Sequence, residues 1–117
     1  MGGPLWAGYA PPMPTTTIDR ASIAKAIAEV SLLRGTFTLR SGRTSSYYLD
    51  KYLFSTRPEV LRPLAGLFAE HVGAMEKKAG ARAVRLAGAE LGGIPLVTAA
   101  AMEMGLPCLF VRNKKKD

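Results

Sequence analysis

The stretch that decides the fold lies at residues 82–111 and reads RAVRLAGAELGGIPLVTAAAMEMGLPCLFV. Residues 82–87 are typical of a β-strand, residues 88–93 of a tight glycine turn, and Pro95 opens a predicted helix. Residues 107–111 then form a predicted buried strand. A strand, a helix and a second strand in this order form a βαβ unit with parallel strands. The sequence therefore predicts the α/β fold class.

A helix and a hairpin are predicted near the start of the chain. Asp19 is a typical N-cap, and apolar residues recur at helical spacing behind it, which predicts an amphipathic helix that ends near Leu33. The residues on that apolar stripe are Ile23, Ile27 and Val30. Residues 37–39 and 46–50 are short predicted strands on either side of a turn.

A longer helix is predicted between the hairpin and the βαβ unit. Residues 56–59, TRPE, form a capping-box pattern with a proline in the first turn. The helix should run to Lys78, end at Gly80 and present one broad apolar face. That face comprises Val60, Leu61, Leu64, Leu67, Phe68, Val72 and Met75.

Length and composition predict one domain behind a short leader. The chain has 117 residues, of which 48% are hydrophobic, so residues 18–117 suffice for a single core. Residues 1–17 hold four prolines and three glycines without periodicity, which predicts a disordered leader. Met13 directly precedes the first organised segment and is an alternative start to Met1.

Several classes of protein are excluded by composition. The sequence has no run of about 18 apolar residues, so no membrane-spanning helix is predicted. The first residues lack the pattern of a secretory signal. The single cysteine, Cys108, cannot form an internal disulfide, which favours a reducing cytoplasm. With His71 as the single histidine, the chain cannot supply four zinc ligands.

The net charge of +7 favours anionic partners, although a solvated basic surface explains it equally well. Three segments could bind an anion. Residues 88–93 lead through glycines into a helix start, where free N–H groups and the helix dipole meet. Residues 112–116 are basic and follow a predicted parallel strand. Residues 40–48, RSGRTSSYY, combine arginines, hydroxyls and aromatic rings. The alternatives that remain are an ordinary turn for residues 88–93, a solvated basic tail for residues 112–116 and a polar hairpin for residues 40–48.

Read together, three segments resemble the orotate phosphoribosyltransferases, a branch of the type I phosphoribosyltransferases. They are residues 35–50 (GTFTLRSGRTSSYYLD), 87–96 (AGAELGGIPL) and 110–117 (FVRNKKKD). The resemblance spans residues 20–117 and implies a parallel sheet with flanking helices and an N-terminal hood made of a helix and a hairpin. It implies transfer of a phosphoribosyl group from phosphoribosyl pyrophosphate to orotate, which yields orotidine 5′-phosphate and pyrophosphate in pyrimidine biosynthesis.

The resemblance also implies cofactor, partners and site residues. Mg²⁺ would be bound with the pyrophosphate substrate and not by a metal site of the chain, and the enzyme would be a cytoplasmic homodimer without nucleic-acid or membrane partners. Arg112 and Lys116 would be the catalytic residues that clamp pyrophosphate. The substrate-binding residues would be Arg40 at the donor, Tyr48 and Leu49 at the orotate ring, Glu90, Leu91, Gly92 and Gly93 at the pyrophosphate, and Asn113 where a second basic residue often stands.

The chain departs from the family in one respect. The family's donor signature, two adjacent acids after a hydrophobic strand and before a Thr/Gly-rich loop, is absent, because all nine acidic residues are isolated. We therefore expect the chain to be the N-terminal portion of such an enzyme and to be inactive alone. The alternative is a non-catalytic module of the same family that binds an anion or a nucleotide. A purine or uracil phosphoribosyltransferase is disfavoured by residues 37–48.

Overall fold

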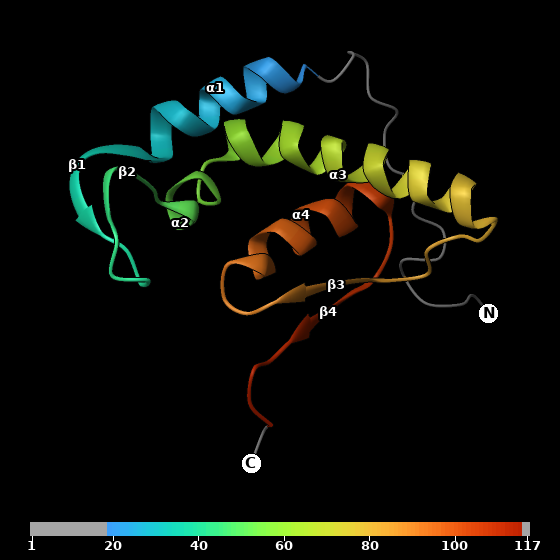
Figure 1. The fold of residues 1–117 in the computed structure, drawn as a ribbon. Coiled ribbons are helices and arrows are strands. Elements are labelled where there is room, and N and C mark those ends of the chain that lie inside the picture. The colour runs from blue at the N-terminus through green and yellow to red at the C-terminus, as the bar shows by residue number, and fades with distance from the viewer. Residues whose placement is uncertain (1–18, 116–117) are drawn as a thin grey trace.

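The computed structural model describes residues 19–115. Its helices and strands run in the order α1 (Arg20–Ser31), β1 (Leu32–Thr38), β2 (Thr44–Leu49), α2 (Lys51–Phe54), α3 (Pro58–Ala79), β3 (Leu86–Ala89), α4 (Gly93–Met104) and β4 (Cys108–Val111) (Figure 1). The predictions of a disordered leader and of an alternative start at Met13 lie outside the described residues.

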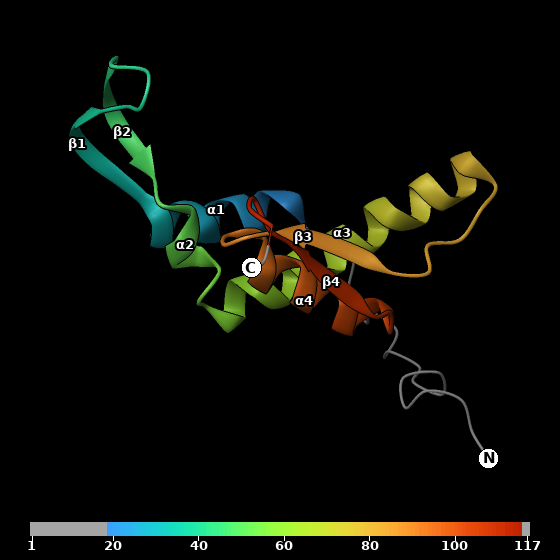
Figure 2. The same cartoon turned by 90° about the horizontal axis from the view of Figure 1, so that it is seen from below.

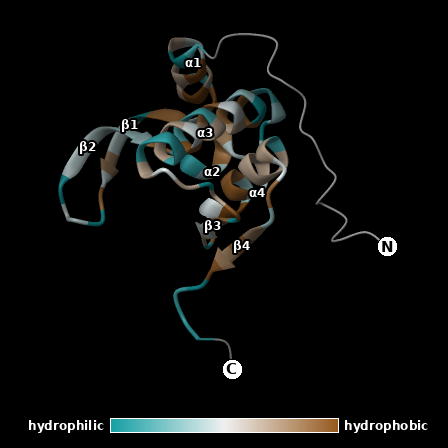
Figure 3. Ribbon diagram, turned by 90° about the vertical axis from the view of Figure 1, so that its right-hand side faces the viewer, coloured by the Kyte–Doolittle hydropathy of each residue, from teal (hydrophilic) through white to brown (hydrophobic). Residues whose placement is uncertain are grey.

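The predicted βαβ unit is present and defines an α/β fold. β3 pairs with β4 in parallel, from Leu86 opposite Cys108 to Ala89 opposite Val111, and α4 connects the two strands. α3 and α4 lie on the same side of this small sheet (Figures 1 and 3). α3 ends at Gly80 as predicted, and α4 ends at Gly105 in the same way, because both glycines adopt positive φ angles, of 65° and 66°, and close the last turns.

The N-terminal hood comprises α1, the antiparallel β1–β2 hairpin and α2. Asp19 caps α1 as predicted, and the Ser22 hydroxyl that donates to its carboxylate lowers the pKa of Asp19. α1 ends at Ser31, two residues before the predicted end near Leu33. Leu32 already pairs with Leu49 in the hairpin, and the Asp50 N–H donates to the Ser31 carbonyl at 2.9 Å. Strand pairing has therefore taken two residues from the predicted helix.

Ser31 is an unusual residue at this junction, because its side chain is fully buried and its hydroxyl has no hydrogen-bond partner among the described residues. We expect Ser31→Ala to raise the free energy of unfolding by about 1 kcal/mol, since it removes a buried, unpaired hydroxyl and favours the helix. Urea denaturation measures the change. Ser22→Ala is the matched control and should lower stability, because it removes the bond to Asp19.

The start of α3 differs from the predicted capping box. The N-cap is Arg57, which makes no side-chain capping bond. The Thr56 hydroxyl instead donates to the Leu53 carbonyl at 2.7 Å, and Glu59 pairs with the Arg57 guanidinium at 2.7 Å. The hydrogen bond from the Thr56 hydroxyl to α2 competes with capping of α3 by Thr56. Of the predicted signals, only Pro58 marks the start of α3 in the structure.

The strands of the parallel sheet also differ from prediction. β3 covers Leu86–Ala89 and not residues 82–87, so Gly88 and Ala89 belong to the strand and not to the turn. The expectation of a buried second strand is wrong as well, because Leu109, Phe110 and Val111 are 42–52% exposed. Helices cover one side of this sheet, and β4 has β3 as its one paired neighbour among the described residues.

The core is small and is formed by residues of α1, α3 and α4, with α3 packed between the other two helices (Figure 1). Its buried apolar residues are Ile23, Val60, Ala65, Val97, Ala100 and Ala101. The predicted apolar face of α3 is only partly covered, since Phe68 is 38% and Met75 is 68% exposed, because α4 crosses only part of α3 (Figure 1). Within residues 19–115, no helix is both long enough and apolar enough to cross a membrane.

Candidate functional site

The glycine loop after β3 and the basic segment after β4 meet at one end of the sheet. The Glu90 N–H donates to the Val111 carbonyl at 2.9 Å, and the Glu90 carboxylate accepts the Asn113 N–H at 2.7 Å. Both segments follow the carboxyl ends of parallel strands, where ligands bind in open α/β sheets. The structure thus brings together two of the three segments that the sequence singled out.

The loop itself leads into the N-terminus of α4. Gly92 is the N-cap with a φ of −64°, and the Ile94 N–H donates to the Leu91 carbonyl at 3.1 Å. The peptide bond between Glu90 and Leu91 is cis. The first turn of α4 contains no acidic residue, so its amides and dipole present a positive end to an incoming anion.

The segment that the Glu90 hydrogen bonds join to this loop is basic. Arg112, Lys114 and Lys115 are exposed and follow β4 without a break. Figure 3 shows the change from an apolar β4 to a hydrophilic segment at this point. Exposed cations next to a helix N-terminus favour a phosphate or diphosphate ligand. The second predicted catalytic residue, Lys116, lies outside the described residues.

The residue predicted at the donor, Arg40, and those predicted at the orotate ring, Tyr48 and Leu49, lie in the hood. Arg40 is exposed in the hairpin turn, and Tyr48 and Leu49 on β2 are each 46% exposed. The Tyr48 ring packs against Phe37 with ring centroids 5.8 Å apart. The tip of the hairpin lies apart from the β3–β4 sheet (Figures 1 and 2). The single chain therefore does not bring Arg40 beside the glycine loop.

Tyr52 on α2 is a site residue that the sequence analysis missed. A Cβ atom on Gly92 would lie 3.5 Å from a ring carbon of Tyr52, so the edge of the aromatic ring lies next to Gly92. The Asp50 carboxylate caps the Tyr52 N–H at 3.0 Å, and the Ser55 hydroxyl donates to the Tyr52 carbonyl at 2.9 Å. An aspartate before a short helix is an N-cap signal that could have located this turn.

The described residues do not by themselves fit a protein-held metal ion. Residues 19–115 contain no group of three His, Cys, Asp or Glu side chains that could hold one. The acid of the glycine loop, Glu90, is engaged with the Asn113 N–H. Mg²⁺ typically keeps several oxygen ligands from water and substrate phosphates, so an ion here would depend on the oxygens of a phosphorylated substrate.

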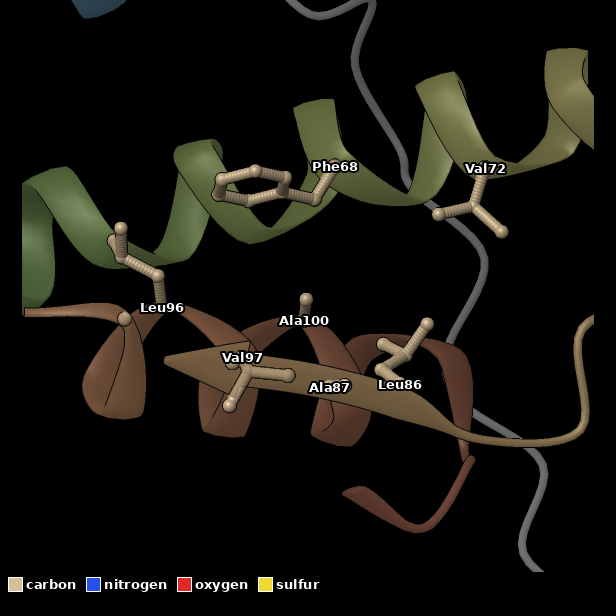
Figure 4. A pocket seen from close by; sticks show the side chains of 9 residues that line it. Phe68, Val72, Leu86, Ala87, Leu96, Val97 and Ala100 are labelled. Atoms are coloured by element: carbon tan, nitrogen blue, oxygen red, sulfur yellow. The ribbon is translucent and has the colours of Figure 1, made fainter. Parts of the chain in front are cut away.

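A cavity of about 320 Å³ lies between α3, α4 and β3 (Figure 4). Apart from Gly88 and Gly93, apolar side chains line it: Phe68, Val72, Leu86, Ala87, Leu96, Val97 and Ala100. It offers no charged or hydrogen-bonding side chain, so it does not suit a phosphorylated ligand. The candidate site is therefore the glycine loop with the basic segment and not this cavity.

The chain is similar in sequence to several orotate phosphoribosyltransferases. No protein-family profile matches the chain. The orotate phosphoribosyltransferase of Natronomonas pharaonis is 45% identical over 83 residues, which are 71% of this chain and 43% of that protein. That of Halobacterium salinarum is 39% identical over 103 residues, which are 88% of this chain and 53% of that protein. The chain thus spans about half the length of the curated relatives it matches.

Solved structures agree with the sequence relatives. Mycobacterium tuberculosis orotate phosphoribosyltransferase in complex with Fe(III) dicitrate superposes with a TM-score of 0.65 at 27% identity, over 83% of this chain and 53% of that chain. The same enzyme in complex with 5-phospho-alpha-D-ribosyl 1-diphosphate gives a TM-score of 0.60 at 27% identity, over 80% of this chain and 52% of that chain.

Fold and site together define a class of protein. The parallel β3–α4–β4 unit, with helices on one side and a glycine loop facing basic residues, is an incomplete type I phosphoribosyltransferase fold. Within that class, the chain contains an orotate phosphoribosyltransferase-like region.

Proposed function

We propose that the whole protein to which this chain belongs is an orotate phosphoribosyltransferase of pyrimidine biosynthesis. It transfers the phosphoribosyl group of phosphoribosyl pyrophosphate to orotate. The bond from the sugar's anomeric carbon to the diphosphate breaks, a bond to a ring nitrogen of orotate forms, and pyrophosphate leaves. The observation that carries the proposal is the junction at Glu90, which joins the glycine loop to the basic segment.

This junction suits the chemistry that the transfer needs. The departing diphosphate gathers negative charge while the sugar becomes oxocarbenium-like, so the reaction needs charge stabilisation and exclusion of water more than a protein nucleophile. The amides at the start of α4 and the Arg112 guanidinium supply positive charge on the leaving-group side. Lys116 would extend the same clamp.

The other parts of the proposal concern orotate, the metal and assembly. Tyr48 and Leu49 provide an apolar wall for the flat orotate ring, and Arg40 contacts the donor from the hairpin. Mg²⁺ arrives with the diphosphate, whose oxygens supply most of its ligands. The protein works as a homodimer in the cytoplasm, without nucleic-acid or membrane partners.

Two measurements test the proposal. Calorimetric titration of the 117-residue chain with phosphoribosyl pyrophosphate and with inorganic pyrophosphate measures binding. The ultraviolet absorbance of orotate measures turnover by the whole protein, because we expect the chain alone to be inactive. Binding together with turnover would establish the enzyme. Absence of binding of either ligand would contradict the proposal for this region.

A non-catalytic anion- or nucleotide-binding module is the second candidate. It is favoured by the fact that the anion-facing loop is fully formed in a chain that spans about half the length of its relatives. Diphosphate binding without any turnover by the whole protein would favour this candidate.

Arg40 permits a more specific prediction. We expect Arg40→Ala to weaken binding of the donor or of orotate about threefold to fivefold, because Arg40 lies in an exposed hairpin turn apart from the glycine loop and its charge is screened by solvent. Arg40→Lys should retain affinity, since a lysine keeps the charge. Titration of each ligand at low and at high salt measures the effect, which should shrink as salt rises. Unchanged affinity for both ligands would assign Arg40 to an ordinary polar turn.

A further inference from the structure

Glu90 is an acidic residue in a loop that otherwise suits an anion. Its neighbours across the junction, Arg112, Lys114 and Lys115, are exposed cations. A carboxylate at this place repels a diphosphate, so direct contact with the ligand does not explain it. Its side chain has a different partner, the Asn113 N–H at 2.7 Å.

The two hydrogen bonds of Glu90 bracket Arg112. Its N–H donates to the carbonyl of Val111, the residue before Arg112, and its carboxylate accepts from the N–H of Asn113, the residue after it. The first bond continues the β3–β4 ladder by one step beyond Ala89 and Val111. The second is a charge-assisted bond between residues 23 positions apart, and it extends the connection past the end of β4.

We propose that Glu90 is a positioning residue that holds Arg112 against the glycine loop in an orientation that binds diphosphate. The ladder by itself ends at the Val111 carbonyl, so without the carboxylate the chain from Arg112 onward has one anchor instead of two. The inference rests on the proposed function in one respect, because the ligand that Arg112 meets is a diphosphate.

The two possible effects of the carboxylate can be separated by substitution. Glu90→Gln removes the negative charge but keeps a side-chain oxygen that accepts the Asn113 N–H. Glu90→Ala removes both. If Glu90 acts by positioning, Glu90→Ala weakens diphosphate binding, whereas Glu90→Gln keeps or raises the affinity. If it acts through charge alone, both variants bind diphosphate more tightly.

Inorganic pyrophosphate is the probe, and the 117-residue chain is titrated by calorimetry. We expect E90A to bind pyrophosphate about fivefold to tenfold more weakly, while E90Q binds as tightly as the original chain or up to about threefold more tightly. The gain of E90Q should vanish at 0.5 M salt, whereas the loss of E90A should persist. Glu29→Ala is the control for overall charge, because Glu29 is exposed on α1, and it should leave affinity unchanged.

A second measurement needs no ligand. Amide hydrogen exchange followed by nuclear magnetic resonance reports the protection of the Asn113 N–H, which should be lost in E90A and largely kept in E90Q. Equal protection in all three proteins, or equal affinity gains in E90A and E90Q, would overturn the inference. If the original chain fails to bind pyrophosphate, the proposed function fails, and Asn113 protection alone then decides whether Glu90 positions the segment.

Discussion

Replacing Gly88 by alanine is expected to lower the free energy of unfolding by about 1–3 kcal/mol and to abolish diphosphate binding. A Cβ atom at Gly88 would lie 2.6 Å from Val97 Cγ1 and 2.7 Å from the Gly93 carbonyl oxygen. Val97 is buried and stiff at its β-carbon, and the Gly93 carbonyl belongs to the first turn of α4. Neither neighbour can yield unless the helix moves as a whole.

The helix displacement explains why binding is lost together with stability. β3 and α4 meet backbone to backbone at Gly88 and Gly93, and the anion-facing loop joins these two elements. A shift at the start of α4 therefore moves the amides that would meet the diphosphate. Urea denaturation measures stability and calorimetry with pyrophosphate measures binding.

Gly73→Ala provides the matched control for Gly88→Ala. Gly73 lies within α3, and a Cβ atom there would meet nothing within 4 Å. The free energy of unfolding of this variant should rise by up to about 1 kcal/mol, because alanine is a better helix former than glycine. A Gly88→Ala protein with the denaturation midpoint of the original chain would show that the close approach of β3 and α4 is not required.

Replacing Arg112 by alanine is expected to weaken pyrophosphate binding by about tenfold to 150-fold, the range that corresponds to about 1.5–3 kcal/mol for hydrogen bonds to a charged group. The guanidinium is exposed beside the glycine loop, so its loss removes ligand contacts and little packing. Stability should change by less than about 0.5 kcal/mol, as at most exposed positions. Arg112→Ala should thus weaken binding and leave stability nearly unchanged, whereas Gly88→Ala should lower both.

Arg82→Ala is the charge-matched control for Arg112→Ala. Arg82 is also exposed, but it lies in the segment between α3 and β3, at the opposite end of the sheet from the loop. It should leave pyrophosphate affinity nearly unchanged. Arg112→Lys should recover part of the affinity, because lysine restores the charge without the two-pronged geometry. Equal losses for the alanine variants at residues 82 and 112 would mean that only overall charge matters.

The relation between sequence and fold is clearest at the helices and the glycine loop. Asp19, Pro58, Gly80 and Gly105 mark helix ends through local backbone chemistry, and all four do so in the structure. Helix capping depends on a few neighbouring residues, so it is visible in the sequence. The prediction of a capping box at Thr56 was wrong, because the N-cap is Arg57 and the Thr56 hydroxyl donates to the Leu53 carbonyl.

The sequence by itself determined the α/β class, the βαβ unit and the resemblance that points to a phosphoribosyl transfer. Only the tertiary structure decided where α1 ends, that Gly88 packs closely against α4, and that β4 is exposed. It also decided that Tyr52 contacts the glycine loop and that Glu90 binds the basic segment. The physical reason is distance along the chain. Caps and turns form between residues a few positions apart. Residues that are distant in the sequence meet only after the chain has folded, as do Leu32 and Leu49, Tyr52 and Gly92, and Glu90 and Asn113.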